Sequence, residues 1–177
     1  MRSPFLPLAL ATAFFSAAAC HSLSRGHTPR GTAALHDASG RSVGVLDLEQ
    51  SSTGVRIIGD LSGLPGGRHG IHFHQTGRCD GPDFTSAGAH FNPFNRKHGL
   101  ENPEGPHAGD MQNVVIPAQG AVLVEMLSPR VTLDDAVTTV FDADGTALVI
   151  HAAADDQRTD PSGNSGARIA CGVIVRR

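Results

Sequence analysis

The chain has 177 residues, which is enough for one domain with a proper hydrophobic core. Its 14 lysines and arginines are set against 17 aspartates and glutamates, and this mild net charge of −3 argues against nucleic acid as a partner. The apolar segments are too short for a membrane-spanning helix, which needs about 20 apolar residues.

Residues 1–19 are typical of a bacterial export signal. Arg2 supplies the positive charge, residues 5–15 form a short apolar stretch, and small residues at 17–19 precede the expected cleavage site. We therefore expect an exported protein of the periplasm or cell envelope.

Cys20 leaves two processing routes open. Ordinary cleavage would leave three cysteines in an oxidising compartment, whereas lipidation of Cys20 would leave the even pair Cys79 and Cys171, which favours lipidation. A lipidated Cys20 would tether the protein to a membrane. Residues 20–31 are polar, as is typical of a linker, so the folded domain is expected to span residues 32–177.

Short alternating runs recur from Thr32 onward, with Gly and Asp turns between them, and such alternation predicts half-buried strands. The runs are residues 32–36, 43–48, 54–61, 69–74, 113–116, 121–127, 147–151 and 169–175. They predict an all-β, antiparallel, eight-stranded sandwich or flattened barrel. At most one turn of helix is expected, near residues 133–137.

The stretch from residue 71 to residue 110 is rich in side chains that bind metals. Alternate side chains of a strand share a face, so His72 and His74 are expected to project together and could share one ion. A Gly-, Pro- and Asn-rich run without helical or strand period follows, and it predicts a long ordered loop. It carries His90, His98, His107 and Asp110. A loop of this length in a compact domain needs an internal anchor, and a metal ion is the candidate.

His151 ends the apolar run 147–151. Taken alone, it is either a core histidine, which is favoured, or a ligand that points towards a neighbouring strand. A second long loop, residues 152–167, is rich in Asp, Gly, Pro and Ser and leads to Arg168. Without its flanking motif, Arg168 would be interpreted as a solvated side chain at the start of an edge strand.

Six segments together resemble the copper-zinc superoxide dismutase family. They are residues 70–74 (GIHFH), 85–93 (TSAGAHFNP), 97–99 (KHG), 107–110 (HAGD), 151–156 (HAAADD) and 163–174 (GNSGARIACGVI). They follow the family order and cover nearly the whole domain, which makes chance agreement negligible. The resemblance implies a Greek-key sandwich or flattened barrel, immunoglobulin-like in architecture, with two long functional loops.

The resemblance also implies one copper and one zinc ion per chain. It assigns His72, His74, His90 and His151 to copper, and His90, His98, His107 and Asp110 to zinc. His90 would therefore serve both ions. Four imidazoles suit tetragonal copper(II), while three imidazoles and a carboxylate suit a closed tetrahedral zinc site.

Further roles follow from the same resemblance. Arg168 is expected to dock the anionic substrate through its permanent charge. Asp155 is expected to accept hydrogen bonds from one copper-binding and one zinc-binding histidine and so to orient both. Cys79 and Cys171 are expected to form a disulfide bond.

The implied function is dismutation of superoxide to dioxygen and hydrogen peroxide by a copper redox cycle, with a structural zinc and a bridging histidine. The alternative is an exported copper/zinc-binding module without turnover, or a metallochaperone-like domain. Such domains typically lose copper ligands or the docking arginine, and this chain keeps both. Thr76 stands where many eukaryotic members carry an aromatic residue at the dimer contact, so a homodimer is not assumed.

Overall fold

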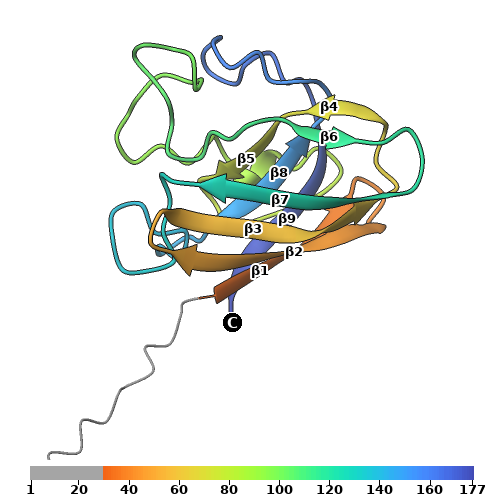
Figure 1. Ribbon diagram of the computed structural model, residues 1–177, viewed down its shortest axis with the longest axis horizontal. Helices are drawn as coiled ribbons and strands as arrows, with labels where there is room; N and C mark the ends of the chain where they lie inside the picture. Colours follow the sequence, from red (N-terminus) through yellow and green to blue (C-terminus); the bar gives the residue numbers. More distant parts are fainter. Residues whose placement is uncertain (1–29) are drawn as a thin grey trace, which may run out of the picture.

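The computed structural model describes residues 30–177, which form nine β-strands and one short 3₁₀ turn (Figure 1). The predicted signal, Cys20 and nearly all of the predicted tether lie outside the described residues. The elements are β1 (Arg30–Asp37), β2 (Ser42–Ser51), β3 (Gly54–Ser62), β4 (Gly67–His69), β5 (Ile71–His74), η1 (Thr85–Ala87), β6 (Val114–Ile116), β7 (Ala121–Ser128), β8 (Ala147–His151) and β9 (Arg168–Arg176). Within residues 30–177, no helix is long and apolar enough to cross a membrane.

Seven strands form one antiparallel sheet in the order β5-β8-β9-β1-β2-β3-β7, and β4 pairs with β6 in a second, small sheet. Figure 1 shows the large sheet curling, with β4 and β6 beside its upper edge. Neighbours that are distant in sequence, such as β3 with β7 and β1 with β9, require connections across the ends of the sheet, as in a Greek key. The predicted all-β antiparallel fold is confirmed.

Alternation along the strands explains the core. In β3, Val55, Ile57 and Leu61 are buried, while Arg56 and Asp60 face solvent. Burying this apolar face removes hydrocarbon surface from water, which stabilises the fold by about 25 cal/mol per Å². The core is therefore built from aliphatic side chains.

A bulge in β2 changes which residues point inward. Pairing with β1 skips Val43, which is the extra residue between the pairs Leu35 with Gly44 and His36 with Ser42. A Cβ atom on Gly44 would lie 2.0 Å from the carbonyl oxygen of Asp60, so only glycine fits there. Because of the extra residue, Val43 and Leu46 both reach the core although they are three positions apart.

The strand predicted at residues 69–74 is divided into β4 and β5, which gives nine strands instead of eight. Gly70 is the break: its N–H donates to the carbonyl of Ala153 (2.9 Å), and its carbonyl accepts from the N–H of His151 (2.8 Å). The hydrogen bonds at this break therefore link the strand to the start of the second long loop.

The helical turn expected at residues 133–137 is wrong. The N–H of Leu133 donates to Oε1 of Gln50 (2.7 Å), and the hydroxyl of Thr132 donates to the same oxygen (2.9 Å). Leu133 is fully buried and its amide is bound to Gln50 of β2, so residues 133–137 form bends and the start of a turn instead of a helix.

Two long connections, residues 75–113 and 152–167, lie at the same end of the molecule (Figure 1). The disulfide bond between Cys79 and Cys171, which are 92 positions apart, ties the first of them to β9. The predicted pairing of these cysteines is confirmed. The end of the barrel that carries both loops is where the candidate site lies.

Candidate metal centre

The candidate centre begins at β5, where all four side chains are buried. Ile71 and Phe73 belong to the hydrophobic core, and His72 and His74 point to the opposite face, as alternation predicts. The two imidazoles are thereby held beside β8, with which β5 pairs.

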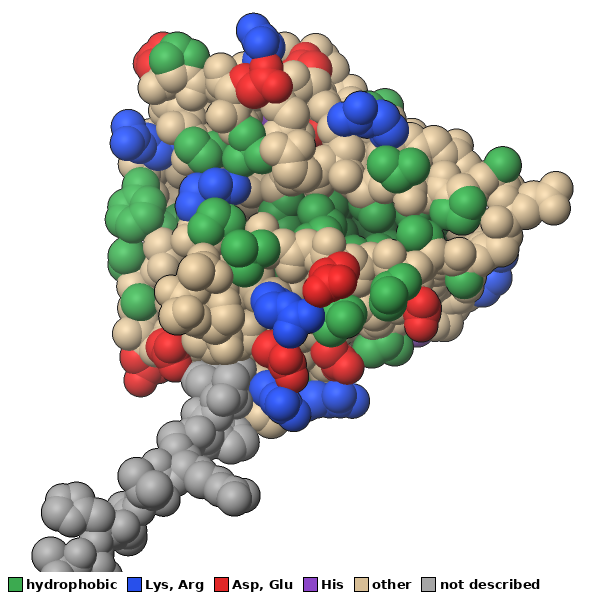
Figure 2. Space-filling view, in the orientation of Figure 1, with side chains coloured by type: hydrophobic (Ala, Val, Ile, Leu, Met, Phe, Trp, Pro, Cys, Tyr) green, Lys and Arg blue, Asp and Glu red, His purple; other side chains and the backbone are tan. Residues whose placement is uncertain are grey.

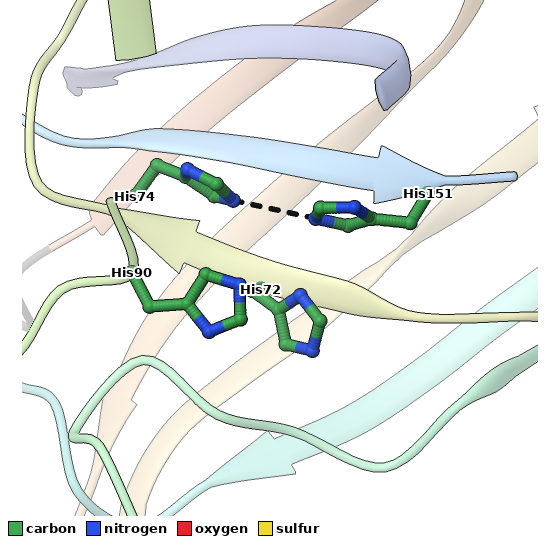
Figure 3. Close-up of side chains that lie close together, drawn as sticks. All are labelled: His72, His74, His90 and His151. Carbon is green, nitrogen blue, oxygen red and sulfur yellow. Dashed lines mark hydrogen bonds between the residues drawn. The ribbon is translucent and has the colours of Figure 1, made fainter. Parts of the chain in front are cut away.

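His90 and His151 complete the first cluster, shown in Figure 3. His151 ends β8, and His90 is brought in from the long loop by a bridge to His74. The ring centroid of His90 lies 4.0 Å from that of His72 and 4.9 Å from that of His74. His151 is therefore a member of this cluster, which favours the ligand interpretation over the core interpretation that its strand alone suggested.

Hydrogen bonds fix which nitrogens face the cluster. Nδ1 of His74 lies 2.9 Å from the carbonyl of Gly88, and Nδ1 of His151 lies 3.2 Å from that of Gly166. A carbonyl cannot donate, so both Nδ1 atoms carry the proton and both Nε2 atoms present lone pairs. These Nε2 atoms face each other at 3.4 Å, as Figure 3 shows.

Two other ring nitrogens are left without partners. Nδ1 of His72 and Nε2 of His90 are buried and have no hydrogen bond within the described chain. A buried polar atom without a partner is costly. Four imidazole nitrogens, all within 4.8 Å of one another, therefore converge on a position where a cation would satisfy all of them.

The second cluster lies around Asp110, and its four ligand atoms lie close together. Oδ1 of Asp110 is 3.0 Å from Nδ1 of His90, 3.0 Å from Nδ1 of His98 and 3.3 Å from Nδ1 of His107. Nδ1 of His90 and Nδ1 of His107 are 3.5 Å apart. Ligand atoms placed tetrahedrally at zinc-like bond lengths of about 2.0 Å lie about 3.3 Å from one another. The donor set thus has the dimensions of a closed tetrahedral site.

All seven ligand-type residues predicted from the sequence are brought together, each at most 6 % exposed. The face of the molecule in Figure 2 accordingly shows almost no histidine surface; positive and negative side chains alternate on it, and hydrophobic side chains line a hollow across its middle. Of the histidines that the structure describes, His36 and His69 belong to neither cluster. His21 and His27 lie outside the described residues.

Burial sets the protonation of the first cluster. It lowers the pKa of His72 to about 3 and that of His151 to about 4, and it lowers the pKa of His74 well below its usual value. These imidazoles are therefore neutral at neutral pH, the state in which they bind metals.

His98 lies between two carboxylates. Burial alone would lower its pKa, but the hydrogen bonds to Asp110 and Asp155 outweigh burial and raise the pKa to about 9. Hydrogen bonds from His107, His90 and His98 hold the pKa of Asp110 far below its usual range, against the effect of its own burial. This charge arrangement favours a cation between the histidines and Asp110.

Asp155 connects the two clusters as predicted. Its Oδ2 lies 2.7 Å from Nε2 of His72, and its Oδ1 lies 3.0 Å from Nε2 of His98. Hydrogen bonds from these histidines lower the pKa of Asp155 although burial raises it, so the carboxylate is charged and both Nε2 atoms donate. Gly163 allows this approach, because a Cβ there would lie 1.8 Å from Oδ1 of Asp155.

Arg168 lies beside the first cluster. Its two terminal nitrogens donate to the carbonyls of Phe84 and Gly88, each at 2.6 Å, and the Gly88 carbonyl also accepts from His74. The half-buried guanidinium is thus fixed next to a ligand candidate. It shares the lining of a cavity of about 440 Å³ with Asp83, whose negative charge opposes that of Arg168.

His69 is a supporting residue that sequence reasoning missed. Its Nδ1 lies 2.8 Å from the carbonyl of His151, and its Nε2 lies 2.9 Å from the carbonyl of Pro65. The buried ring thereby holds the backbone of a ligand candidate in place. A partner that is a backbone carbonyl leaves no pattern in the sequence, so no signal was available.

Comparison with known proteins gives a consistent result. The family described as "Copper/zinc superoxide dismutase (SODC)" matches residues 42–174. A copper-zinc superoxide dismutase of Aquifex aeolicus is 50 % identical over 76 % of this chain and 81 % of its own length. An extracellular superoxide dismutase of Haemonchus contortus is 38 % identical over 76 % of this chain and 74 % of its own. The crystal structure of a double mutant of a superoxide dismutase-like protein from Bacillus subtilis matches with a TM-score of 0.78 and 44 % identity, over 80 % of this chain and 95 % of the other.

Proposed function

Because the chain belongs to the copper/zinc superoxide dismutase family and dismutes superoxide to dioxygen and hydrogen peroxide, we propose that its two clusters are the copper and zinc sites of that reaction. Copper is held by His72, His74, His90 and His151, and zinc by His90, His98, His107 and Asp110. Bound copper supplies the one-electron oxidation and reduction of superoxide, while zinc has no redox chemistry and fixes its ligands.

One observation carries this assignment: His90 belongs to both clusters and presents one ring nitrogen to each. Its Nδ1 faces Asp110 at 3.0 Å, and its Nε2 is buried without a hydrogen-bond partner inside the first cluster. The outward nitrogens of His72, His74 and His151 are instead held by a carboxylate or a carbonyl. Only His90 is therefore placed to serve two ions at once.

The protein orients the remaining ligands before any ion binds. Gly88 and Gly166 keep a proton on Nδ1 of His74 and of His151, which leaves Nε2 of each free. Asp155 keeps a proton on Nε2 of His72, which leaves Nδ1 free. A ligand set whose tautomers and ring planes are fixed in advance loses little freedom when it binds metal.

Arg168 docks the substrate. Its guanidinium carries a permanent charge, and two backbone carbonyls hold it beside His74. An anion that enters the cavity lined by Arg168 is drawn towards the first cluster and oriented there. Asp83 weakens this attraction because it lines the same cavity.

Export is supported by the relatives, which include extracellular superoxide dismutases. We propose further that residues 1–19 direct it and that lipidation of Cys20 tethers the protein to a membrane, on the ground of cysteine parity: Cys79 and Cys171 are already paired. Retention of membrane association by a Cys20→Ser variant would contradict the tether. The homodimer is not part of the proposal.

Selective removal of metal tests the assignment. His151→Ala should lose copper and the removal of superoxide but keep zinc, because His151 belongs to the first cluster alone. His107→Ala should lose zinc binding first. His36→Ala is the matched control, since His36 is exposed and lies outside both clusters. Metal content by elemental analysis and superoxide removal are measured on the same samples. A fully metallated wild-type protein that does not remove superoxide would instead support a binding module without turnover.

A further inference from the structure

A second cavity lies against the long loop, outside the metal centre. It has a volume of about 240 Å³ and is lined by Phe94, Arg96, Gly105, Pro106, Ala108 and Arg130. None of the seven ligand-type residues lines it, and neither does any carboxylate. The lining of the cavity therefore has two positive side chains, an apolar wall and no negative side chain.

Arg130 is the more buried of the two cations. One terminal nitrogen donates to the carbonyl of Asp110 at 2.5 Å, while its Nε is buried and has no hydrogen-bond partner among residues 30–177. Arg130 forms no ion pair with a carboxylate among residues 30–177, where Asp110 is bound by histidines, although the charge of Asp110 lies near it. A half-buried guanidinium without a paired carboxylate costs free energy, part of which an anion in the cavity would recover.

Arg96 is exposed and also lacks a carboxylate partner in the described part of the chain. Most lysine and arginine side chains among residues 30–177, by contrast, form ion pairs with carboxylates. Those in ion pairs are Arg30, Arg41, Arg56, Arg78, Lys97, Arg158 and Arg177. The backbone of Arg96 is fixed at both its N–H and its carbonyl by the side chain of Asn92, at 3.0 and 2.9 Å. The backbone of Arg96 is therefore fixed, and its side chain lines the cavity.

The rest of the wall is apolar. The ring of Phe94 is 57 % exposed although it lines the cavity, and Pro106 and Ala108 add hydrocarbon surface. An exposed aromatic ring beside guanidinium groups suits a ligand that has both an anionic and an apolar part. Guanidinium forks match the two oxygens of a carboxylate.

We propose that this cavity is a binding site for a small carboxylate with an apolar body. The carboxylate lies between Arg96 and Arg130, where it meets the terminal nitrogens of their guanidinium groups, and the apolar part lies on Phe94. The site is separate from Arg168, which belongs to a different cavity. It takes no part in the redox reaction.

Benzoate is a suitable probe, because it combines a carboxylate with a planar apolar ring. Calorimetric titration of the metal-loaded protein should show one benzoate bound, and benzamide, which has the same shape without the charge, should bind at least about ten times more weakly. Phosphate should also bind more weakly than benzoate, since it cannot use Phe94. Equal binding of benzoate and benzamide would overturn the proposal.

Three variants locate the site. Arg96→Gln should weaken benzoate binding about tenfold or more, and Phe94→Ala should weaken benzoate but not phosphate. Arg96 and Phe94 are chosen because they are exposed, so their replacement should leave the fold intact. Arg56→Gln is the matched control and should change nothing, because Arg56 is paired with Glu125 on the outer sheet face. Loss of benzoate binding in Arg168→Gln, with binding retained in Arg96→Gln, would place the anion at the substrate cavity and overturn the inference.

Discussion

The sheet formed by β1, β2, β3 and β7 and the loop of residues 75–113 both have buried interiors, but of opposite chemistry. The sheet buries aliphatic side chains such as Leu35, Leu46 and Ile57, and each strand is paired in register with its neighbours. The loop buries imidazoles and a carboxylate beside a few apolar side chains such as Phe91 and Met111, and it has little regular pairing. The sheet is therefore stable through the hydrophobic effect, whereas the loop is compact because its polar interior can hold cations.

Removal of both metals should produce the largest difference in order between the loop and the sheet. Without cations the facing Nε2 atoms of His74 and His151 have no shared partner, so the loop should lose order while the sheet keeps its core. Hydrogen exchange should become fast in residues 85–112 and stay slow in residues 42–62, and superoxide removal should be lost. Reloading with zinc alone should restore protection of the loop but not the activity. Equal loss of protection in both regions would contradict the comparison.

A cavity in the sheet should have the converse effect. Ile57 is fully buried, so Ile57→Ala should lower the free energy of unfolding by about 2–5 kcal/mol. Metal affinity should be unchanged, because Ile57 lies in β3 and no residue of that strand belongs to either cluster. Urea denaturation and zinc competition measure the two quantities. Ile58→Ala, on the same strand but facing outward, is the control and should cost clearly less. A parallel loss of zinc affinity in Ile57→Ala would show that the regions are coupled.

Asp155→Asn should act on the loop and leave the sheet unaffected. An amide cannot accept from both His72 and His98 as a carboxylate does, so we expect zinc affinity to fall by about 10- to 100-fold. Zinc competition against a chelator measures this loss. Asp156→Asn is the matched control, because Asp156 bonds only to residues of its own loop, among them Thr159. Full zinc affinity in Asp155→Asn would show that Asp155 only caps its loop.

The same contrast explains what could be predicted. The strands were found because alternation of apolar residues indicates which face is buried. The break at Gly70 and the non-helical segment at Leu133 were missed, since both depend on bonds to distant residues. Arg30 and Gly31 were assigned to the linker but are the first two residues of β1. The loop has no period, so the grouping of its histidines came from family resemblance. His69 and Arg130 were missed as supports because each binds a backbone carbonyl, which any residue supplies.

Removing a surface charge should change kcat/KM when the charge lies in the loop of residues 75–113, but not when it lies on the outer face of the sheet. Asp83 shares the cavity of Arg168, so Asp83→Asn should raise kcat/KM for superoxide by about 1.5- to 3-fold at low ionic strength, and the gain should disappear as salt screens the charges. Asp60→Asn removes the same charge from the outer face of β3 and is the control. Steady-state rates across a salt series decide the matter, and an equal gain in both variants would indicate an effect of net charge alone.

The smallest change in stability is expected at the turn between β1 and β2, which contributes no residue to either cluster. Hydrogen bonds from Ser39 and Arg41 lower the pKa of Asp37 to about 2, below its unfolded value near 4. A depressed pKa stabilises the fold above the unfolded value, and that contribution is lost as the pH falls through the folded value. Asp37→Asn should therefore be slightly less stable than the wild type at pH 7, and the difference should shrink below pH 4. Urea denaturation of both proteins between pH 7 and pH 3 measures it. If the difference in stability instead stayed constant with pH, the stability of the turn would depend on the shape of the Asp37 side chain and not on its charge.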